Sequence, residues 1–191
     1  MRENNLFPDN QPADRAYSMP LSIKIDKAVA LLGEYEQEAI KLNDNGFCCA
    51  FSGGKDSGVI ERLTKRAGVR HSLDYSVTTL DPPELIRHIK DNYNATFHRQ
   101  PRALLTEMVE NTSCKGPPTR LMRWCCEKYK ENTGNTQWKI LGVRAKESPR
   151  RKKTWKQVIV NNNNNKVCIV NPILYWTERD VWDFHRDQNI P

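Results

Sequence analysis

Apolar residues along the chain alternate between helical spacing and short runs that suit buried strands. Over residues 22–40 they recur every three or four positions, which predicts a helix, and the Asn-Asp-Asn-Gly stretch at 43–46 ends it. The apolar run at 47–51 predicts a short buried strand. Similar patterns predict strands over 72–79, 95–98 and 138–143, and helices over 56–67, 82–93, 101–110, 121–131 and 178–187, the last with Thr177 as its N-cap.

This alternation of strands and helices predicts an α/β fold, with a doubly wound, mainly parallel sheet in three layers. Residues 158–160 and 167–170 flank five asparagines, and we expect a hairpin or an exposed connection there. Residues 1–19 are polar and should form a mobile or loosely attached N-terminal arm. A single domain of ordinary size would then span residues 20–191.

The charge balance narrows the class of partner. The formal net charge of +7 favours an anionic partner, either a nucleotide or a nucleic acid, although a solvated basic surface would give the same value. No apolar run reaches the eighteen residues that a membrane span needs, and the first twenty residues resemble no secretory signal. We therefore expect a cytoplasmic protein.

The segment that follows the strand at 47–51 is suited to binding phosphate. It reads Ser52-Gly53-Gly54-Lys55-Asp56-Ser57 and leads into a helix. The two glycines let an anion approach the backbone, and the helix offers free N–H groups and the positive end of its dipole. The hydroxyls of Ser52 and Ser57 could donate to phosphate oxygens, Lys55 adds charge, and Asp56 could cap the helix or hold Mg²⁺. The spacing matches neither the Walker A loop nor the GxGxxG loop, and a plain turn remains the alternative.

Two further groups of residues follow predicted strands, where ligands bind in open α/β sheets. Thr79 and Asp81 end the second strand, and Asp81 could bind a ribose hydroxyl or a metal, or cap the next helix. The strand at 138–143 leads into a group rich in arginine, whose guanidinium forks suit phosphate or sulfate. Its candidate binding residues are Gly142, Arg144, Glu147, Ser148 and Arg151, with Arg144 the foremost. A solvated basic turn is the alternative.

Four of the six cysteines form two adjacent pairs. Cys48 and Cys49 lie in an apolar run and should be buried core thiols. Cys125 and Cys126 are adjacent on a predicted helix, where a disulfide between neighbours would be strained. Basic neighbours should lower their pKa and favour thiolate, which suits metal ligation or redox chemistry, although one buried and one spare thiol is the simpler alternative. These neighbours are Arg120, Arg123 and Lys128.

An ordered set of segments resembles a known family. SGGKDS after an apolar strand resembles the PP-loop of the adenine nucleotide alpha hydrolase superfamily. Four more segments resemble its phosphoadenosine phosphosulfate (PAPS) reductase branch: TTLDPPEL at 78–85, RWCCEKYK at 123–130, LGVRAKESPRR at 141–151 and NPILYWTERDVWDF at 171–184. The resemblance runs from Ile23 to Pro191.

The resemblance implies an enzyme that binds ATP or PAPS at residues 52–57, with Mg²⁺ accompanying ATP, and acts on the phosphate or phosphosulfate linkage in sulfur-related metabolism. Lys55, Asp56 and Arg144 would be its catalytic residues. Cys125 and Cys126 resemble the first half of the ligand set of an iron–sulfur reductase, so a [4Fe–4S] cluster would need further cysteines. Related domains often continue beyond the final Asn-Ile-Pro, so the chain could be truncated at its C-terminus.

Three functions remain open from the sequence. One is sulfonucleotide reduction or transfer from an adenine nucleotide. Another is an ATP pyrophosphatase or sulfur-transfer component that acts on nucleic acid, as in phosphorothioation or thiolation, or works with a sulfur-carrier protein; the positive charge would serve a polyanion. The third is a nucleotide-binding regulatory module without catalysis. The oligomeric state is left open.

Overall fold

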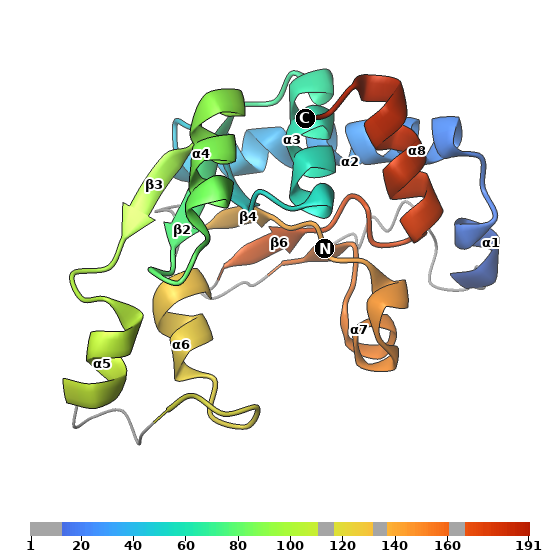
Figure 1. Ribbon diagram of the computed structural model, residues 1–191. Coiled ribbons are helices and arrows are strands. Elements are labelled where there is room, and N and C mark those ends of the chain that lie inside the picture. The colour runs from blue at the N-terminus through green and yellow to red at the C-terminus, as the bar shows by residue number, and fades with distance from the viewer. Residues whose placement is uncertain (1–12, 111–116, 132–136, 161–166) are drawn as a thin grey trace.

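A computed structural model describes residues 13–110, 117–131, 137–160 and 167–191 (Figure 1). Its helices are α1 Ala13–Tyr17, α2 Leu21–Leu42, α3 Lys55–Ala67, α4 Pro83–Asn92, α5 Leu104–Glu110, α6 Trp124–Cys126, the π-helix Glu127–Glu131, the 3-10 helix Ala145–Glu147, α7 Pro149–Thr154 and α8 Glu178–Gln188. Its strands are β1 Phe47–Phe51, β2 His71–Val77, β3 Thr96–Arg99, β4 Trp138–Ile140, β5 Val158–Ile159 and β6 Cys168–Val170.

The strands form one sheet in the order β3-β2-β1-β4-β6-β5, which confirms the α/β class. All neighbours pair in parallel except β5 and β6, which run antiparallel as the predicted hairpin requires. In Figure 1, α2, α3, α4 and α8 lie on one side of the sheet, and α5, α6 and α7 lie on the other. The asparagine run between β5 and β6 falls outside the described residues.

The strand order locates the expected binding edge. The chain moves from β1 to β2 and β3 in one direction, and β4 then adds on the opposite side of β1. The loops after β1 and β4 therefore leave the sheet side by side at a switch point, where ligands of open α/β folds bind. These loops contain the two strongest groups of candidate residues.

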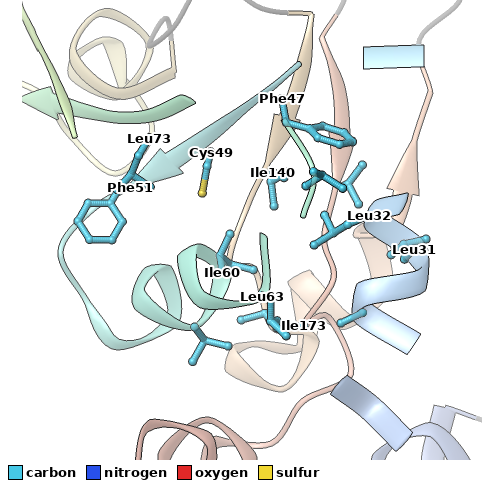
Figure 2. Close-up of a cluster of buried hydrophobic side chains, with 14 of the residues drawn as sticks. Leu31, Leu32, Phe47, Cys49, Phe51, Ile60, Leu63, Leu73, Ile140 and Ile173 are labelled. Atoms are coloured by element: carbon cyan, nitrogen blue, oxygen red, sulfur yellow. The ribbon is translucent and has the colours of Figure 1, made fainter. Parts of the chain in front are cut away.

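The core lies between the central strands and the helices α2 and α3 (Figure 2). Phe47 and Cys49 of β1, Ile60 and Leu63 of α3 and Leu32 of α2 have no exposed side-chain surface. A parallel strand covered on both faces needs such a continuous apolar run, which is why β1 was predictable. Burial also raises the pKa of Cys49 well above its ordinary value, and Cys48 and Cys49 are buried as expected.

Two boundaries differ from the expectation for local reasons. The second strand ends at Val77 rather than at Thr79, because the Asp81 carboxylate accepts a hydrogen bond from the Thr78 N–H (2.7 Å) and turns the chain. The helix expected over 121–131 begins only at Trp124. Thr119 forms a turn before it, since its Oγ1 accepts from the Met122 N–H at 3.0 Å.

The termini of the described chain pack on the domain. Residues 13–17, within the expected arm, form α1, and Tyr17 packs with Ala145 and Leu174. The α8 helix begins with a capping box in which Thr177 and Asp180 bond each other's backbone, as predicted for Thr177. None of the helices in the described ranges has the length and apolar character needed to cross a membrane.

Candidate functional site: the loop between β1 and α3

The loop after β1 needs glycine at one position for two separate reasons. Gly53 has φ +72°, a left-handed conformation that residues with side chains rarely adopt. A Cβ atom there would also lie 2.6 Å from Leu85 Cδ1 and 2.9 Å from Ile89 Cδ1 on α4. Gly54 follows as the N-cap of α3 and has no side-chain cap hydrogen bond. The first turn of α3 therefore presents its backbone N–H groups at the carboxyl edge of the sheet.

The hydroxyls of the two serines in the loop are hydrogen-bonded to each other. Ser57 is buried, and its hydroxyl donates to the Gly54 carbonyl at 2.8 Å. The exposed Ser52 contributes its hydroxyl to Ser57 Oγ at 3.2 Å. Ser57 thus uses its one donor within the loop, whereas the Ser52 hydroxyl can turn toward a ligand at little cost. Of the two predicted phosphate donors, Ser52 is the better placed.

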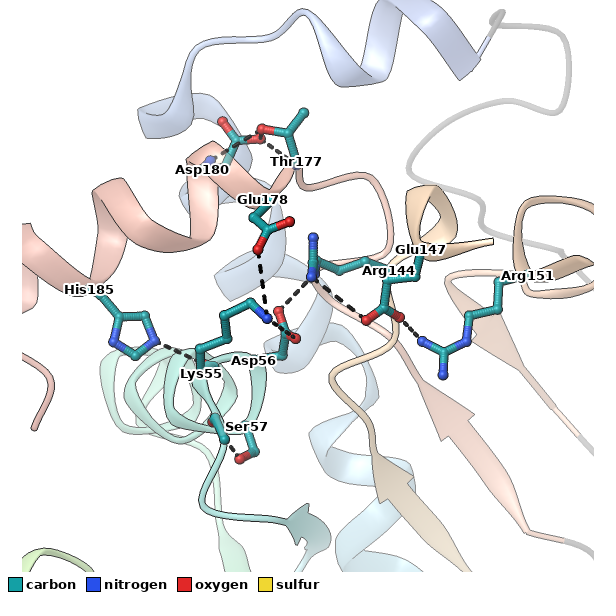
Figure 3. Close-up of polar contacts among 11 residues, drawn as sticks. Lys55, Asp56, Ser57, Arg144, Glu147, Arg151, Thr177, Glu178, Asp180 and His185 are labelled. Carbon is teal, nitrogen blue, oxygen red and sulfur yellow. Dashed lines mark hydrogen bonds and ion pairs between the residues drawn. The ribbon is translucent and has the colours of Figure 1, made fainter. Parts of the chain in front are cut away.

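The loop after β4 meets the first turn of α3 (Figure 3). A Cβ atom on Gly142 would lie 3.2 Å from the Asp56 carbonyl oxygen, so glycine permits this close approach. Arg144, only 5% exposed, then places its Nε 2.7 Å from Asp56 Oδ1. Its Nη2 lies 3.6 Å from Glu147 Oε1, and Glu147 also pairs with Arg151. Four of the predicted residues therefore form one continuous chain of ion pairs.

The pair of Asp56 and Arg144 in this series of ion pairs lacks a hydrogen bond. Asp56 Oδ1 and Arg144 Nε are within ion-pair distance, yet both are buried and neither has a hydrogen-bond partner in the described part of the chain. A buried polar atom without a hydrogen bond costs roughly 1–3 kcal/mol and calls for an explanation, and one explanation is a ligand that binds at the site. At 2.7 Å the two opposite charges attract each other, although the contact does not have the alignment of a hydrogen bond.

Helix α8 contributes two residues that the sequence did not suggest. The carbonyl of Lys55 accepts a hydrogen bond from His185 Nε2 at 2.7 Å, so this ring nitrogen carries a proton. The ammonium group of Lys55 lies 3.9 Å from both Asp56 Oδ2 and Glu178 Oε1. Both α8 residues lie more than 120 positions from the loop, and no local pattern marks such a contact.

Thr79 and Asp81 follow the end of β2 at Val77, where their contacts shape the chain. Thr79 has φ +66°, and its hydroxyl accepts from the Leu104 N–H at 3.0 Å, which ties the loop to α5. Asp81 bonds the Thr78 N–H instead of capping α4, whose N-cap has no side-chain hydrogen bond. Burial is the main cause that raises the pKa of Tyr75, and the nearby charge of Asp81 raises it further.

Comparison with known proteins identifies the family. A family model described as the phosphoadenosine phosphosulfate reductase domain matches residues 46–191. The chain belongs to this family. An adenosine 5'-phosphosulfate (APS) reductase of Staphylococcus epidermidis is 28% identical over 163 residues, which cover 78% of this chain. The chain spans 63% of the length of that relative.

Solved structures share the fold of this PAPS reductase-family domain. FMN adenylyltransferase of Candida glabrata, in complex with FAD and pyrophosphate, has a TM-score of 0.56 at 13% identity, covering 90% of this chain and 61% of its own. PAPS reductase from Candida auris, in a phosphate complex, has a TM-score of 0.55 at 12% identity, covering 97% and 89%. At these identities the likeness concerns the fold alone.

The vicinal cysteines of this PAPS reductase-family domain are free thiols. Cys125 and Cys126 are half-buried, with sulfurs 4.0 Å apart, and Arg123 donates to Cys126 Sγ at 3.3 Å. Burial is the main cause that raises the pKa of Cys125, and the neighbouring Cys126 raises it further. The prediction of a lowered pKa is therefore wrong for Cys125. Lys128, one of the expected basic neighbours, is paired with the buried Glu107.

The described residues do not assemble a metal centre around this pair. Within residues 13–110, 117–131, 137–160 and 167–191, no three His, Cys, Asp or Glu side chains gather as ligands. Cys168 is buried in β6, and Cys114 lies outside the described residues. A [4Fe–4S] cluster takes four thiolates, so Cys125 and Cys126 alone do not fit it.

Proposed function

We propose that this chain is an enzyme that binds the phosphates of an adenine nucleotide over residues 52–57 and acts on a phosphate or phosphosulfate linkage in sulfur-related metabolism. The observation that carries the proposal is the buried, incompletely bonded pair of Asp56 and Arg144 at the N-terminus of α3. A ligand phosphate there would meet helix N–H groups, the helix dipole and a guanidinium fork together. Membership of the PAPS reductase domain family supports the choice of nucleotide.

The proposed roles follow from the contacts of each residue. Lys55 is held only loosely, at 3.9 Å from two carboxylates, so its ammonium group can move to a phosphate oxygen. Arg144 would exchange part of its contact with Asp56 for the same phosphate, because the guanidinium retains donors that the ion pair does not use. Both cations would stabilise negative charge that develops on the linkage as it breaks. The remaining predicted nucleotide ligands are Ser52, Gly53, Gly54, Ser57, Thr79, Asp81, Gly142, Glu147, Ser148 and Arg151.

A second candidate within this class is ATP-dependent transfer of the adenylyl group to an acceptor oxygen, with release of pyrophosphate. Its candidate metal ligand is Asp56, whose carboxylate lies beside Lys55 and Arg144 at the start of α3, where oxygens of the nucleotide phosphates would complete the coordination of a divalent cation. Asp56 would hold the Mg²⁺, whose charge would neutralise the phosphates. The raised pKa of Cys125 also disfavours a thiolate attack on sulfur by that residue.

Calorimetric titration tests nucleotide binding. ATP, AMP, APS and PAPS are each added to the wild-type chain and to Lys55→Ala. We expect at least one of the four to bind the wild type, and to bind Lys55→Ala more weakly. Failure of all four nucleotides to bind the wild-type chain contradicts the proposal.

Product analysis separates the two chemistries. With ATP, Mg²⁺ and a candidate acceptor, the ATP route releases pyrophosphate and forms an adenylated acceptor. With APS or PAPS and a dithiol reductant, the reductive route releases sulfite. Binding without either product would favour the regulatory module that the sequence left open. Lys55→Ala is the control in both assays, because a true product must fall with loss of the loop lysine.

A further inference from the structure

A short segment after the site is far more basic than the rest of the chain. Residues 149–156, here called the basic segment, contain α7 and the two positions after it. Five of the eight residues are basic and none is acidic, against a net charge of +7 for the whole chain. The five are Arg150, Arg151, Lys152, Lys153 and Lys156.

Four of these five cations have no counter-charge among the residues that the structure describes. Arg151 pairs with Glu147, whereas the other four are exposed and form no ion pair within the described part of the chain. Arg150 and Lys153 lie three positions apart on one helix face, where like charges repel each other. The segment is therefore a concentrated positive surface whose repulsion an anionic polymer would relieve.

The basic segment is also joined to the candidate nucleotide site. The 3-10 helix Ala145–Glu147 ends one residue before α7, and the ion pairs run from Arg151 through Glu147 and Arg144 to Asp56 (Figure 3). In Figure 1, α7 stands clear of α2, α3 and α8, on the opposite side of the sheet. A polymer lying on α7 would thus pass next to the loop that carries Arg144.

The chemistry of the segment favours nucleic acid over a lipid surface. Helix α7 has the sequence Pro-Arg-Arg-Lys-Lys-Thr, with no apolar face to enter a bilayer. The nearby Trp155 is half-buried and packs against the cluster of Tyr17, Ala145 and Leu174. Lysine and arginine side chains on an exposed helix are the usual contacts to phosphate oxygens, and such contacts hold a strand without reading its sequence.

We propose that the basic segment binds the sugar–phosphate backbone of a nucleic acid and presents the polymer to the nucleotide site. The binding surface depends only on its own charges, whereas its role in presenting an acceptor rests on the function proposed above. Arg151 is assigned to the nucleotide site, so Arg150, Lys152, Lys153 and Lys156 would make the phosphate contacts.

Fluorescence anisotropy with a labelled 30-nucleotide single strand, as DNA and as RNA, tests the proposal. Four phosphate contacts predict a salt slope of about −2.8, which means about 50-fold weaker binding at 200 mM than at 50 mM salt. In Lys152→Ala/Lys153→Ala the slope should fall to about −1.4, with a loss of about 7-fold over the same range.

The matched control is Lys41→Ala/Arg66→Ala, which removes the same charge. Lys41 and Arg66 are exposed in the last turns of α2 and α3, which precede β1 and β2 and so lie at the amino edge of the sheet. The control should retain the wild-type slope. Absence of binding at 50 mM salt overturns the proposal, as does an equal loss in both double variants. Equal binding of polyglutamate or of anionic vesicles also overturns it.

Nucleotide titrations of the same proteins separate this proposal from the proposed function. Lys152→Ala/Lys153→Ala should bind ATP or PAPS as the wild type does. Lys55→Ala should bind the nucleic acid as the wild type does and bind the nucleotide more weakly. If no nucleotide binds but the salt-dependent binding at α7 persists, the proposed function fails and the nucleic-acid surface stands.

Discussion

Replacing Arg144 with methionine tests the pair of Asp56 and Arg144 most sharply. The substitution keeps an unbranched side chain of similar apolar character and removes the guanidinium, so the Asp56 carboxylate loses its nearest cation and keeps only Lys55 at 3.9 Å. Breaking a fully buried pair costs about 3–5 kcal/mol. Because the Asp56 side chain is 20% exposed, we expect a smaller loss of about 2 kcal/mol in the free energy of unfolding.

Thermal and urea unfolding measure that loss. For a domain of this size it corresponds to a fall in Tm of about 4–8 °C. The control is the double variant Arg144→Met/Asp56→Asn, which removes both charges and should recover about 1 kcal/mol, as expected for coupled neighbours. Nucleotide affinity should remain low in both proteins, because neither has the guanidinium fork.

Two results would refute this reasoning. If the double variant is no more stable than Arg144→Met, the two side chains are not energetically coupled. If Arg144→Met binds ATP or PAPS as tightly as the wild type, the arginine is only a structural partner of Asp56.

Four further predictions concern other parts of the account. Gly142→Ala should weaken nucleotide binding in calorimetry, since its Cβ would press on the first turn of α3 at 3.2 Å, whereas Gly33→Ala has nothing within 4 Å and should leave binding unchanged. His185→Ala should lower nucleotide affinity, and His185→Gln should restore part of it by supplying a new donor to the Lys55 carbonyl; equal loss in both would exclude the hydrogen bond as the cause. Partial burial alone would raise the pKa of Asp180, but hydrogen bonds from Lys24 and Thr177 outweigh it and hold that pKa below its usual value. Its stabilisation is therefore present above the unfolded pKa of about 4 and is lost as the pH falls through the folded pKa, so urea unfolding of Asp180→Asn should show lower stability at pH 7 and a smaller loss on acidification than the wild type. Alkylation of Cys125 with iodoacetamide, followed by mass spectrometry, should have its pH midpoint above the ordinary thiol value, and a midpoint near neutrality would contradict the effect of burial.

The sequence predicted the parts of the fold that depend on local patterns. A parallel strand buried on both faces must be apolar throughout, so β1 was visible as a run at 47–51. The turn between β1 and α3 was visible because two glycines and a lysine stand where a strand meets a helix, and phosphate binding there stays a prediction. Thr177 was recognisable as an N-cap because its side chain bonds a residue only three positions away.

What depends on distant contacts could not be predicted. His185 and Glu178 reach Lys55 only because α8 packs beside α3, and no spacing in the sequence encodes that approach. The pKa of Cys125 was wrongly expected to fall, since nearby positive residues are visible in a sequence whereas burial is not. Likewise, the ion pair of Lys128 with Glu107 on α5 joins distant segments and could not be seen in the sequence.

The most direct test of the nucleotide site is an NMR titration of the ¹⁵N-labelled chain with ATP and, separately, with PAPS. The account predicts that the backbone amides of Gly53, Gly54 and Lys55 shift most with at least one nucleotide, while Gly68 at the far end of α3 does not move. Shifts confined to other segments, or none with either nucleotide, would contradict binding at this loop.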